Sequence, residues 1–163
     1  MLRATEIRAA GHWPREEARG TATLDYDARH RRRVRLITDT GEAFLLDLEH
    51  AEMLQAGDGL ALSDGTWIEV KAAPEPLLEV RAATPALLTC LAWHLGNRHL
   101  PTAIEADRLL IREDHVIAQM LQGLGATVRK IAAPFRPEGG AYSAGSHHRD
   151  HHDRTHRHDD RHS

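Results

Sequence analysis

The last eighteen residues of the chain, Ser146 to Ser163, set the strongest limit on how it can fold. They read SHHRDHHDRTHRHDDRHS, with seven histidines, four aspartates, four arginines and no large apolar side chain. A segment without apolar surface to bury cannot offset the entropy that ordering costs. We therefore expect residues 141–163 to form a disordered tail, and the hydrophobic core to come from the residues before it.

The chemistry of this tail favours divalent metals. Neutral imidazole binds Ni(II), Cu(II) and Zn(II), and aspartate adds oxygen ligands, so composition does not choose among these ions. A disordered segment can wrap an ion with many pairs or triplets of side chains, which predicts several exchangeable sites rather than one rigid cage. A purification tag and a solubilising tail are the alternatives, although tags are unbroken histidine runs. The candidate ligands are His147, His148, His151, His152, His156, His158 and His162.

The bulk composition argues against several classes of protein. The formal net charge of −3 argues against a nucleic-acid binder that relies on positive charge. Cys90 is the single cysteine, so no intrachain disulfide and no thiolate zinc cluster can form, and its place between Leu88 and Leu91 predicts a buried structural thiol. No apolar run is long enough for a membrane span and no signal peptide is visible, so we expect a cytoplasmic protein without membrane contact.

Residues 1–73 carry the signals of a small all-β domain. The segments RVRLITD and AFLLDL flank the turn-prone DTGE, and GLALSD and GTWIEVKA flank a second turn at Asp64-Gly65. We interpret the basic run Arg29 to Arg35 as a solvated strand edge, with a partner-docking surface as the alternative. The segment APEP, Ala73 to Pro76, predicts a linker, because proline interrupts helices and central strands.

Residues 74–140 predict two helices among four strands, in the order β-α-β-β-α-β. Thr84 and Pro85 favour the start of a helix that stops at Gly96, and Asp114 favours the start of a second that stops at Gly125. Because this order is that of the ferredoxin-like motif, we expect an α+β fold in which a ferredoxin-like domain follows the all-β domain. The predicted apolar faces are Leu87, Leu88, Leu91 and Leu95 on the first helix, and Val116, Ile117, Met120, Leu121 and Leu124 on the second.

Three histidines of this second domain are candidate metal ligands, although each has an ordinary structural alternative as a cap or a surface side chain. His94 would lie in the last turn of the first helix, where a cation suits the helix dipole. His115 would open the second helix, where the dipole favours the neutral imidazole that binds metal. His99 would lie in the loop after Gly96. A lone histidine cannot hold an ion, but two copies that face each other across a two-fold axis can.

The sequence gives no sign of catalysis. It has no GxSxG, no HExxH and no glycine-rich phosphate loop, so we expect a protein that is not an enzyme. RNA binding through the second sheet is also disfavoured, because its strands contain almost no aromatic residues, with Phe135 at the end of the last.

Several motifs taken together resemble one known family. GNRH, DHV, MLQGLGA and PFRPEGGAY follow one another in the order and spacing of the UreE family of urease accessory proteins, the nickel metallochaperones. The resemblance extends from Gly20 to Tyr142 and includes the histidine-rich tail. It implies an N-terminal β domain for peptide or protein partners, a ferredoxin-like metal-binding domain, and a homodimer joined through that second domain.

The resemblance also implies roles for single residues. His99, the histidine of GNRH, would donate to a metal at the dimer interface together with its copy in the second subunit. His94 and His115 correspond to secondary positions in some members. Some relatives carry a further histidine two residues before the DHV histidine, where this chain has Glu113, which argues against an accessory site on that face.

The function implied by the resemblance is delivery of Ni(II) to apo-urease, together with a GTPase accessory protein. Two imidazoles make an incomplete shell, finished by tail histidines or water, so that an acceptor can add its ligands before the donor's ligands leave. A general buffer or store for nickel, zinc or copper without a dedicated client is the alternative. A hydrolytic enzyme that uses the metal is a third hypothesis, which predicts an activity lost in His99→Ala.

Overall fold

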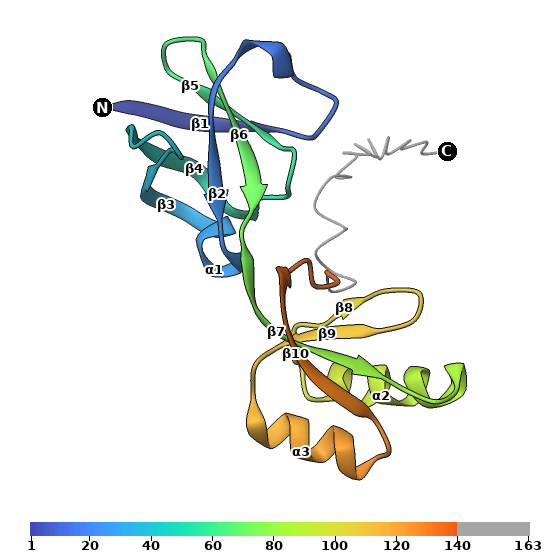
Figure 1. The fold of residues 1–163 in the computed structure, drawn as a ribbon. Helices are drawn as coiled ribbons and strands as arrows, with labels where there is room; N and C mark the ends of the chain where they lie inside the picture. The colour runs from blue at the N-terminus through green and yellow to red at the C-terminus, as the bar shows by residue number, and fades with distance from the viewer. Residues whose placement is uncertain (140–163) are drawn as a thin grey trace, which may run out of the picture.

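Strands dominate the fold, and they form two separate sheets with helices packed on the second (Figure 1). The structure is a computed structural model and describes residues 1–139. The mixture of strands and helices agrees with the predicted α+β class. The predicted tail, residues 141–163, lies outside the described residues.

The first sheet has six strands in the order β2-β6-β5-β1-β4-β3. Both predicted hairpins are confirmed, because β3 pairs with β4 and β5 pairs with β6, each antiparallel. The turn between β5 and β6 uses Gly65 at φ +84°, a left-handed conformation that glycine adopts without a steric penalty. The strands are β1 (Leu2–Arg8), β2 (Ala18–Leu24), β3 (His30–Ile37), β4 (Ala43–Met53), β5 (Gly59–Leu62) and β6 (Trp67–Ala72).

This unit is not purely β, because two short helices join its strands. They are the 3-10 helix η1 (Arg15–Glu17) and the single turn α1 (Tyr26–Arg29), which Asp25 caps by accepting a hydrogen bond from the Ala28 N–H. Hydrogen bonds from Asp39, which follows the end of β3, connect the two edge strands of the sheet, β2 and β3. The Asp39 N–H donates to the Thr21 carbonyl, and the Asp39 carboxylate accepts from the Thr21 and Thr23 hydroxyls. These hydrogen bonds hold the pKa of Asp39 below its usual value.

Trp13 packs against one end of the first sheet and was not identified from the sequence. Its ring is 8% exposed, stacks on Trp67 at a centroid distance of 5.6 Å, and donates its indole N–H to the Gly57 carbonyl over 3.0 Å. A Cβ atom built at Gly59 would lie 2.3 Å from the Trp13 ring. Only glycine therefore fits under this indole.

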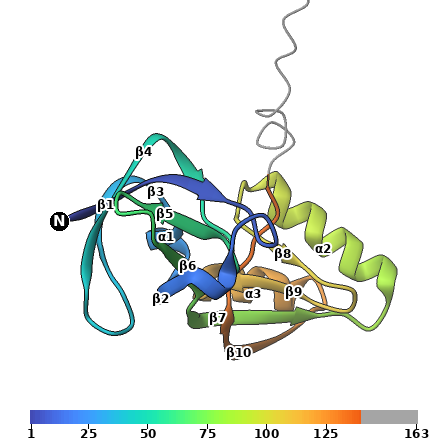
Figure 2. The same cartoon turned by 90° about the horizontal axis from the view of Figure 1, so that it is seen from above.

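The second sheet has four strands in the order β10-β7-β9-β8, and every neighbouring pair is antiparallel. The predicted chain order β-α-β-β-α-β is present in this part of the molecule. Figure 2 gives a second view of the two sheets and of the helices on the second one. The elements are β7 (Pro74–Arg81), α2 (Pro85–Asn97), β8 (Ala103–Ile104), β9 (Leu109–Arg112), α3 (His115–Gly123) and β10 (Thr127–Pro134).

The two faces of the second sheet bury different side chains. Leu78 and Val80 of β7 pack against α2 and α3, which bury Leu91, Leu95, Ile117 and Leu121 on the same core. Leu77, one residue out of phase, faces the other way and packs with Phe135 and Tyr26. The helix-free face of the second sheet therefore meets the first unit at α1.

The prediction of a linker at Ala73 to Pro76 was wrong for all but Ala73, which lies between β6 and β7. Pro74 and Pro76 belong to β7 and pair with Pro134 and Ala132 of β10. The pairing of β7 with β9 begins only at Leu77, so these prolines lie beyond the end of β9, where one edge of β7 has no strand beside it. Proline is tolerated at such a position, since a missing N–H on an open edge removes no ladder hydrogen bond.

The helix starts were predicted correctly, because each depends on local chemistry. The Thr84 hydroxyl accepts from the Leu87 N–H with Pro85 in the first turn, and the Asp114 carboxylate accepts from the N–H groups of Val116 and Ile117. After α3, Gly125 takes a left-handed conformation at φ +100°.

Three predictions about the helix faces were wrong. Val116 is 60% exposed and Leu124 is 39% exposed, because Ile117 and Leu121 alone turn fully toward the sheet. Cys90 is exposed rather than buried. It precedes the buried Leu91 by one position, which rotates it about 100° away from the sheet. Among residues 1–139, no helix is long and apolar enough to cross a membrane.

Glu79 lies on the helix-free face of the second sheet beneath three arginines. Its side chain is 4% exposed, and its carboxylate contacts Arg81 at 3.0 Å, Arg108 at 2.8 Å and Arg129 at 3.3 Å. Hydrogen bonds from Arg81 and Arg108 lower the pKa of Glu79 to about 2. A carboxylate with a lowered pKa stabilises the fold above its unfolded-state pKa, and this contribution is lost as the pH falls toward the folded-state value.

We therefore expect Glu79→Gln to change the pH dependence of stability as well as its size. The wild-type free energy of unfolding, measured with urea, should fall between pH 4.5 and 2 more steeply than that of the variant. At pH 7 the variant should be the less stable protein, because the arginines lose their shared carboxylate. Glu49→Gln, at a side chain that is 91% exposed, is the control and should follow the wild-type curve. Parallel curves for Glu79→Gln and wild type would contradict this account.

Candidate metal site

His99 occupies an unusual backbone position at the end of α2. Its φ is +57°, and it is the one non-glycine residue in the described part of the chain with a positive φ. The His99 N–H donates to the Gly96 carbonyl over 3.0 Å, and the Leu100 N–H donates to the Leu95 carbonyl over 3.2 Å. These two bonds form a Schellman motif, in which the left-handed position occupied by His99 is usually glycine.

This geometry corrects the prediction of where α2 ends. Gly96 was predicted to stop the helix, but α2 continues to Asn97 and His99 takes the left-handed conformation that ends it. A side chain in this conformation costs about 1–2 kcal/mol relative to an ordinary backbone. The fold keeps an imidazole where glycine would be more stable, and His99 is exposed to solvent. Strain of this kind at an exposed ligand-type side chain points to function rather than to packing.

His94 lies in the last turn of α2, as predicted, and is half-buried. Its ring makes an edge-to-face contact with Trp93 at a centroid distance of 5.1 Å and an interplanar angle of 78°. Trp93 is itself 64% exposed, so a large aromatic side chain lies on the surface of α2 beside this candidate ligand. The structure therefore gives His94 an aromatic neighbour, which the sequence analysis did not anticipate.

His115 is the first residue of α3, as predicted, and is exposed. It lines a hollow of about 470 Å³ together with Glu113, Asp114 and Lys130. The Glu113 carboxylate lies 3.7 Å from the Lys130 ammonium group. Glu113 therefore has a lysine partner within this hollow.

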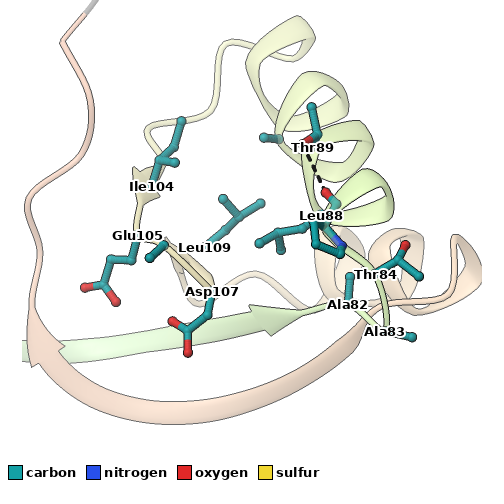
Figure 3. A pocket seen from close by; sticks show the side chains of 12 residues that line it. Ala82, Ala83, Thr84, Leu88, Thr89, Ile104, Glu105, Asp107 and Leu109 are labelled. Carbon is teal, nitrogen blue, oxygen red and sulfur yellow. Dashed lines mark hydrogen bonds between the residues drawn. The ribbon is translucent and has the colours of Figure 1, made fainter.

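An apolar groove of about 460 Å³ lies between α2 and the β8–β9 hairpin (Figure 3). Leu88, Ile104 and Leu109 line it, and Figure 3 shows the carboxylates of Glu105 and Asp107 directed away from these apolar side chains. The groove contains no histidine, so it is a feature separate from the candidate ligands.

The candidate ligands do not meet within one chain. Over residues 1–139, no group of three or more His, Cys, Asp or Glu side chains is arranged to hold a metal ion. A site at His99 therefore needs ligands from a second copy or from residues beyond Gly139, where the seven tail histidines stand in the sequence. The tail histidines themselves lie outside the described residues.

One backbone contact brings the end of the described chain close to the loop that carries His99. The Glu138 N–H donates to the Thr102 carbonyl over 2.8 Å, and Thr102 is three residues after His99. Sequence reasoning missed this contact, because nothing in PFRPEGGAY signals a pairing with the α2–β8 loop.

Comparison with known proteins covers nearly the whole chain. Residues 3–73 match the family model of the UreE urease accessory protein N-terminal domain, and residues 75–162 match that of its C-terminal domain. A protein of Rhodopseudomonas palustris (strain HaA2) is 57% identical over 143 residues, which is 88% of this chain and 66% of the relative. One of Chelativorans sp. (strain BNC1) is 55% identical over 162 residues, 98% of this chain and 100% of the relative. Both relatives are named urease accessory protein UreE.

Proposed function

Because the chain belongs to the UreE family of urease accessory proteins, we propose that it is a nickel metallochaperone that delivers Ni(II) to apo-urease during assembly of the urease metallocentre. As a urease accessory protein of this family, it is not an enzyme. The observation that carries the proposal is the left-handed backbone of His99, which holds an exposed imidazole at a position that favours glycine.

In this proposal the essential site forms between two copies of the chain. One His99 from each subunit supplies two imidazole nitrogens near a two-fold axis. Exposed apolar side chains on the second unit favour such a homodimer, since Trp93 is 64% exposed and Ile104 is 54% exposed. Both flank the connection from α2 to β8 that carries His99.

The tail completes the metal shell and adds capacity. We assign secondary ligand roles to His94 and His115 and the remaining roles to the tail, residues 141–163, whose seven histidines begin at His147. Ni(II) is the cargo, and Zn(II) or Cu(II) can occupy the same nitrogen ligands in vitro. Selection of nickel over copper cannot come from intrinsic affinity, because copper binds nitrogen ligands more tightly. It comes from geometry, partners and cellular supply.

We divide the chain into an N-terminal β domain, residues 1–73, and a ferredoxin-like domain, residues 74–140. The family models, which meet between residues 73 and 75, support the division. The antiparallel strand order β10-β7-β9-β8, with both helices on one face, supports the ferredoxin-like assignment. The first domain would bind apo-urease or the GTPase accessory protein in the cytoplasm, and the second would hold the metal and the dimer interface.

Delivery works by ligand exchange. Two imidazoles leave coordination positions open to water or tail histidines. An acceptor can therefore add its ligands to the ion before the two His99 imidazoles dissociate from it. A closed shell of rigid protein ligands would hold the ion too firmly to transfer it. His99 is exposed, as such an exchange requires.

Activation of urease in a defined mixture tests the function. Apo-urease, its GTPase accessory protein and limiting Ni(II) should give several-fold more active urease when this protein is added. His99→Ala should lose that gain, whereas His50→Ala, at an exposed histidine of β4, should keep it. A buffer without a client would instead compete for nickel and lower the yield. Lower activation with wild-type protein, or equal activation with His99→Ala, would refute the proposed role.

A further inference from the structure

The basic run Arg29 to Arg35 divides into one buried arginine and several exposed ones. Arg29, the last residue of α1, is 0% exposed, so the prediction of a solvated strand edge was wrong for this residue. Its guanidinium donates hydrogen bonds to the Phe135 carbonyl and, over 3.4 Å, to the Leu54 carbonyl. The exposed arginines of the run all lie on β3 and are Arg31, Arg32, Arg33 and Arg35. The arginines of β3 are therefore the ones that a partner protein could contact.

The register of the first sheet places two arginines beside one apolar side chain. Arg35 of β3 and Arg3 of β1 both pair with Leu45 of β4, one from each side. Residues in register on neighbouring strands share a face of the sheet, so these three side chains form a row. The residues that flank Leu45 on β4, Phe44 and Leu46, belong to the buried core. The row therefore lies on the outer face of the sheet.

Two further side chains of β3 extend this row. Arg33 and Ile37 lie two positions to either side of Arg35 and so share its face. Ile37 is 51% exposed, the Arg33 and Arg3 side chains are 56% and 55% exposed, and Leu45 is half-buried. We call Arg3, Arg33, Arg35, Ile37 and Leu45 the outer patch. It combines positive charge with exposed apolar surface.

The outer patch carries more positive charge than its carboxylate neighbour neutralises. Among residues 1–139, Asp47 alone forms ion pairs with it, at 3.2 Å from Arg3 and 4.0 Å from Arg33, and Arg35 has no such partner. On the second sheet, by contrast, the three arginines around Glu79 also pair with two further carboxylates. Like charges on one face of a sheet are destabilising, and the whole chain has a net charge of −3. An anionic partner surface would therefore be stabilising at the outer patch.

We propose that the outer patch is the docking surface for an acidic segment of a partner protein, which also carries apolar side chains. This inference rests on the proposed function, in which the first domain binds apo-urease or the GTPase accessory protein. Guanidinium groups bind carboxylates through paired hydrogen bonds, and aliphatic side chains of the segment would cover Ile37 and Leu45. A nucleic acid offers phosphates but no aliphatic side chain, so a protein is the occupant that the patch favours.

Peptide binding tests the patch directly. A fluorescent synthetic peptide of glutamate, leucine and serine should bind the wild-type chain, more weakly as salt is added, and its counterpart with lysine in place of glutamate should not. Arg35→Glu should weaken binding of the acidic peptide about tenfold, and Arg35→Gln should weaken it less. Arg8→Glu is the matched control, because it makes the same change of charge at a 53% exposed side chain near the other end of β1. It should bind the peptide as wild type does.

Urease activation connects the patch to delivery. In the mixture of apo-urease, GTPase accessory protein and limiting Ni(II), Arg35→Glu should give several-fold less active urease, although its Ni(II) affinity equals that of wild type. Equal activation by Arg35→Glu and Arg8→Glu would overturn the inference.

The peptide experiment has its own contrary outcomes. The inference is overturned by equal peptide binding in Arg35→Glu and Arg8→Glu, by tighter binding of the lysine peptide or of a short DNA duplex, and by a changed number of subunits in Arg35→Glu, which would make the patch a contact between copies. The proposed function fails separately, if His99→Ala activates urease as well as wild type while the acidic peptide still binds.

Discussion

Deleting residues 146–163 is expected to lower the number of Ni(II) ions bound per dimer and to leave one, and His99→Ala in that shortened chain is expected to remove it. The deletion takes away all seven tail histidines, and residues 1–139 contain no group of three or more His, Cys, Asp or Glu side chains arranged to hold a metal ion. In the proposed function, the ion that stays is the one held by the His99 pair. Isothermal titration calorimetry together with light scattering gives ions per dimer. A shortened chain without any bound nickel would show that the metal does not lie between the subunits.

His99→Gly is the sharper form of this experiment. It also removes the imidazole, but it places the residue with the least steric cost at φ +57°. Without metal, we expect the free energy of unfolding of the variant to be about 1 kcal/mol higher than that of wild type, so the variant is more stable. Its nickel binding should nevertheless be lost. Weakened binding in a destabilised protein has many explanations. If the variant is more stable than wild type and still loses nickel binding, the missing imidazole is the cause.

Gly59→Ala is expected to be the most destabilising small substitution in the first sheet. The added methyl group would lie 2.3 Å from the Trp13 ring, far inside van der Waals contact. The indole cannot move aside without breaking its stack on Trp67 and its hydrogen bond to Gly57. We expect a loss of about 3 kcal/mol or more in the free energy of urea unfolding, and a change in tryptophan fluorescence.

Gly123→Ala is the matched control for that substitution. Gly123 ends α3, and a Cβ atom there would meet nothing within 4 Å. Alanine is the better helix former, so this variant should be unchanged or stabilised by up to about 1 kcal/mol. A Gly59→Ala protein as stable as Gly123→Ala would mean that Trp13 does not occupy its described position.

The features that the sequence predicted correctly depend on neighbours in the chain. The Thr84 and Asp114 caps, and the turn at Gly65, arise from contacts within three or four residues, so their residue types are sufficient. The features that it missed involve distant partners. Leu2 pairs in parallel with Phe44, which no local pattern reports. Pro74 was taken for a linker residue because its partner, Pro134, is sixty positions away.

The candidate site shows the same division. His99 could be chosen from its motif, but its left-handed backbone could not, because Gly96 was the expected end of the helix. The contact between Arg29 and Phe135 joins residues 106 positions apart and has no signature in either segment. The tail ligands and the pairing of His99 across a two-fold axis stay predictions.

The hydrogen bond from Glu138 to Thr102 has a practical consequence for shortened variants. It ties the residues after β10 to the α2–β8 loop, so a chain cut before Glu138 leaves the Thr102 carbonyl without this donor. Variants that remove the histidine-rich residues and are meant to preserve this loop should therefore retain the chain up to Gly139.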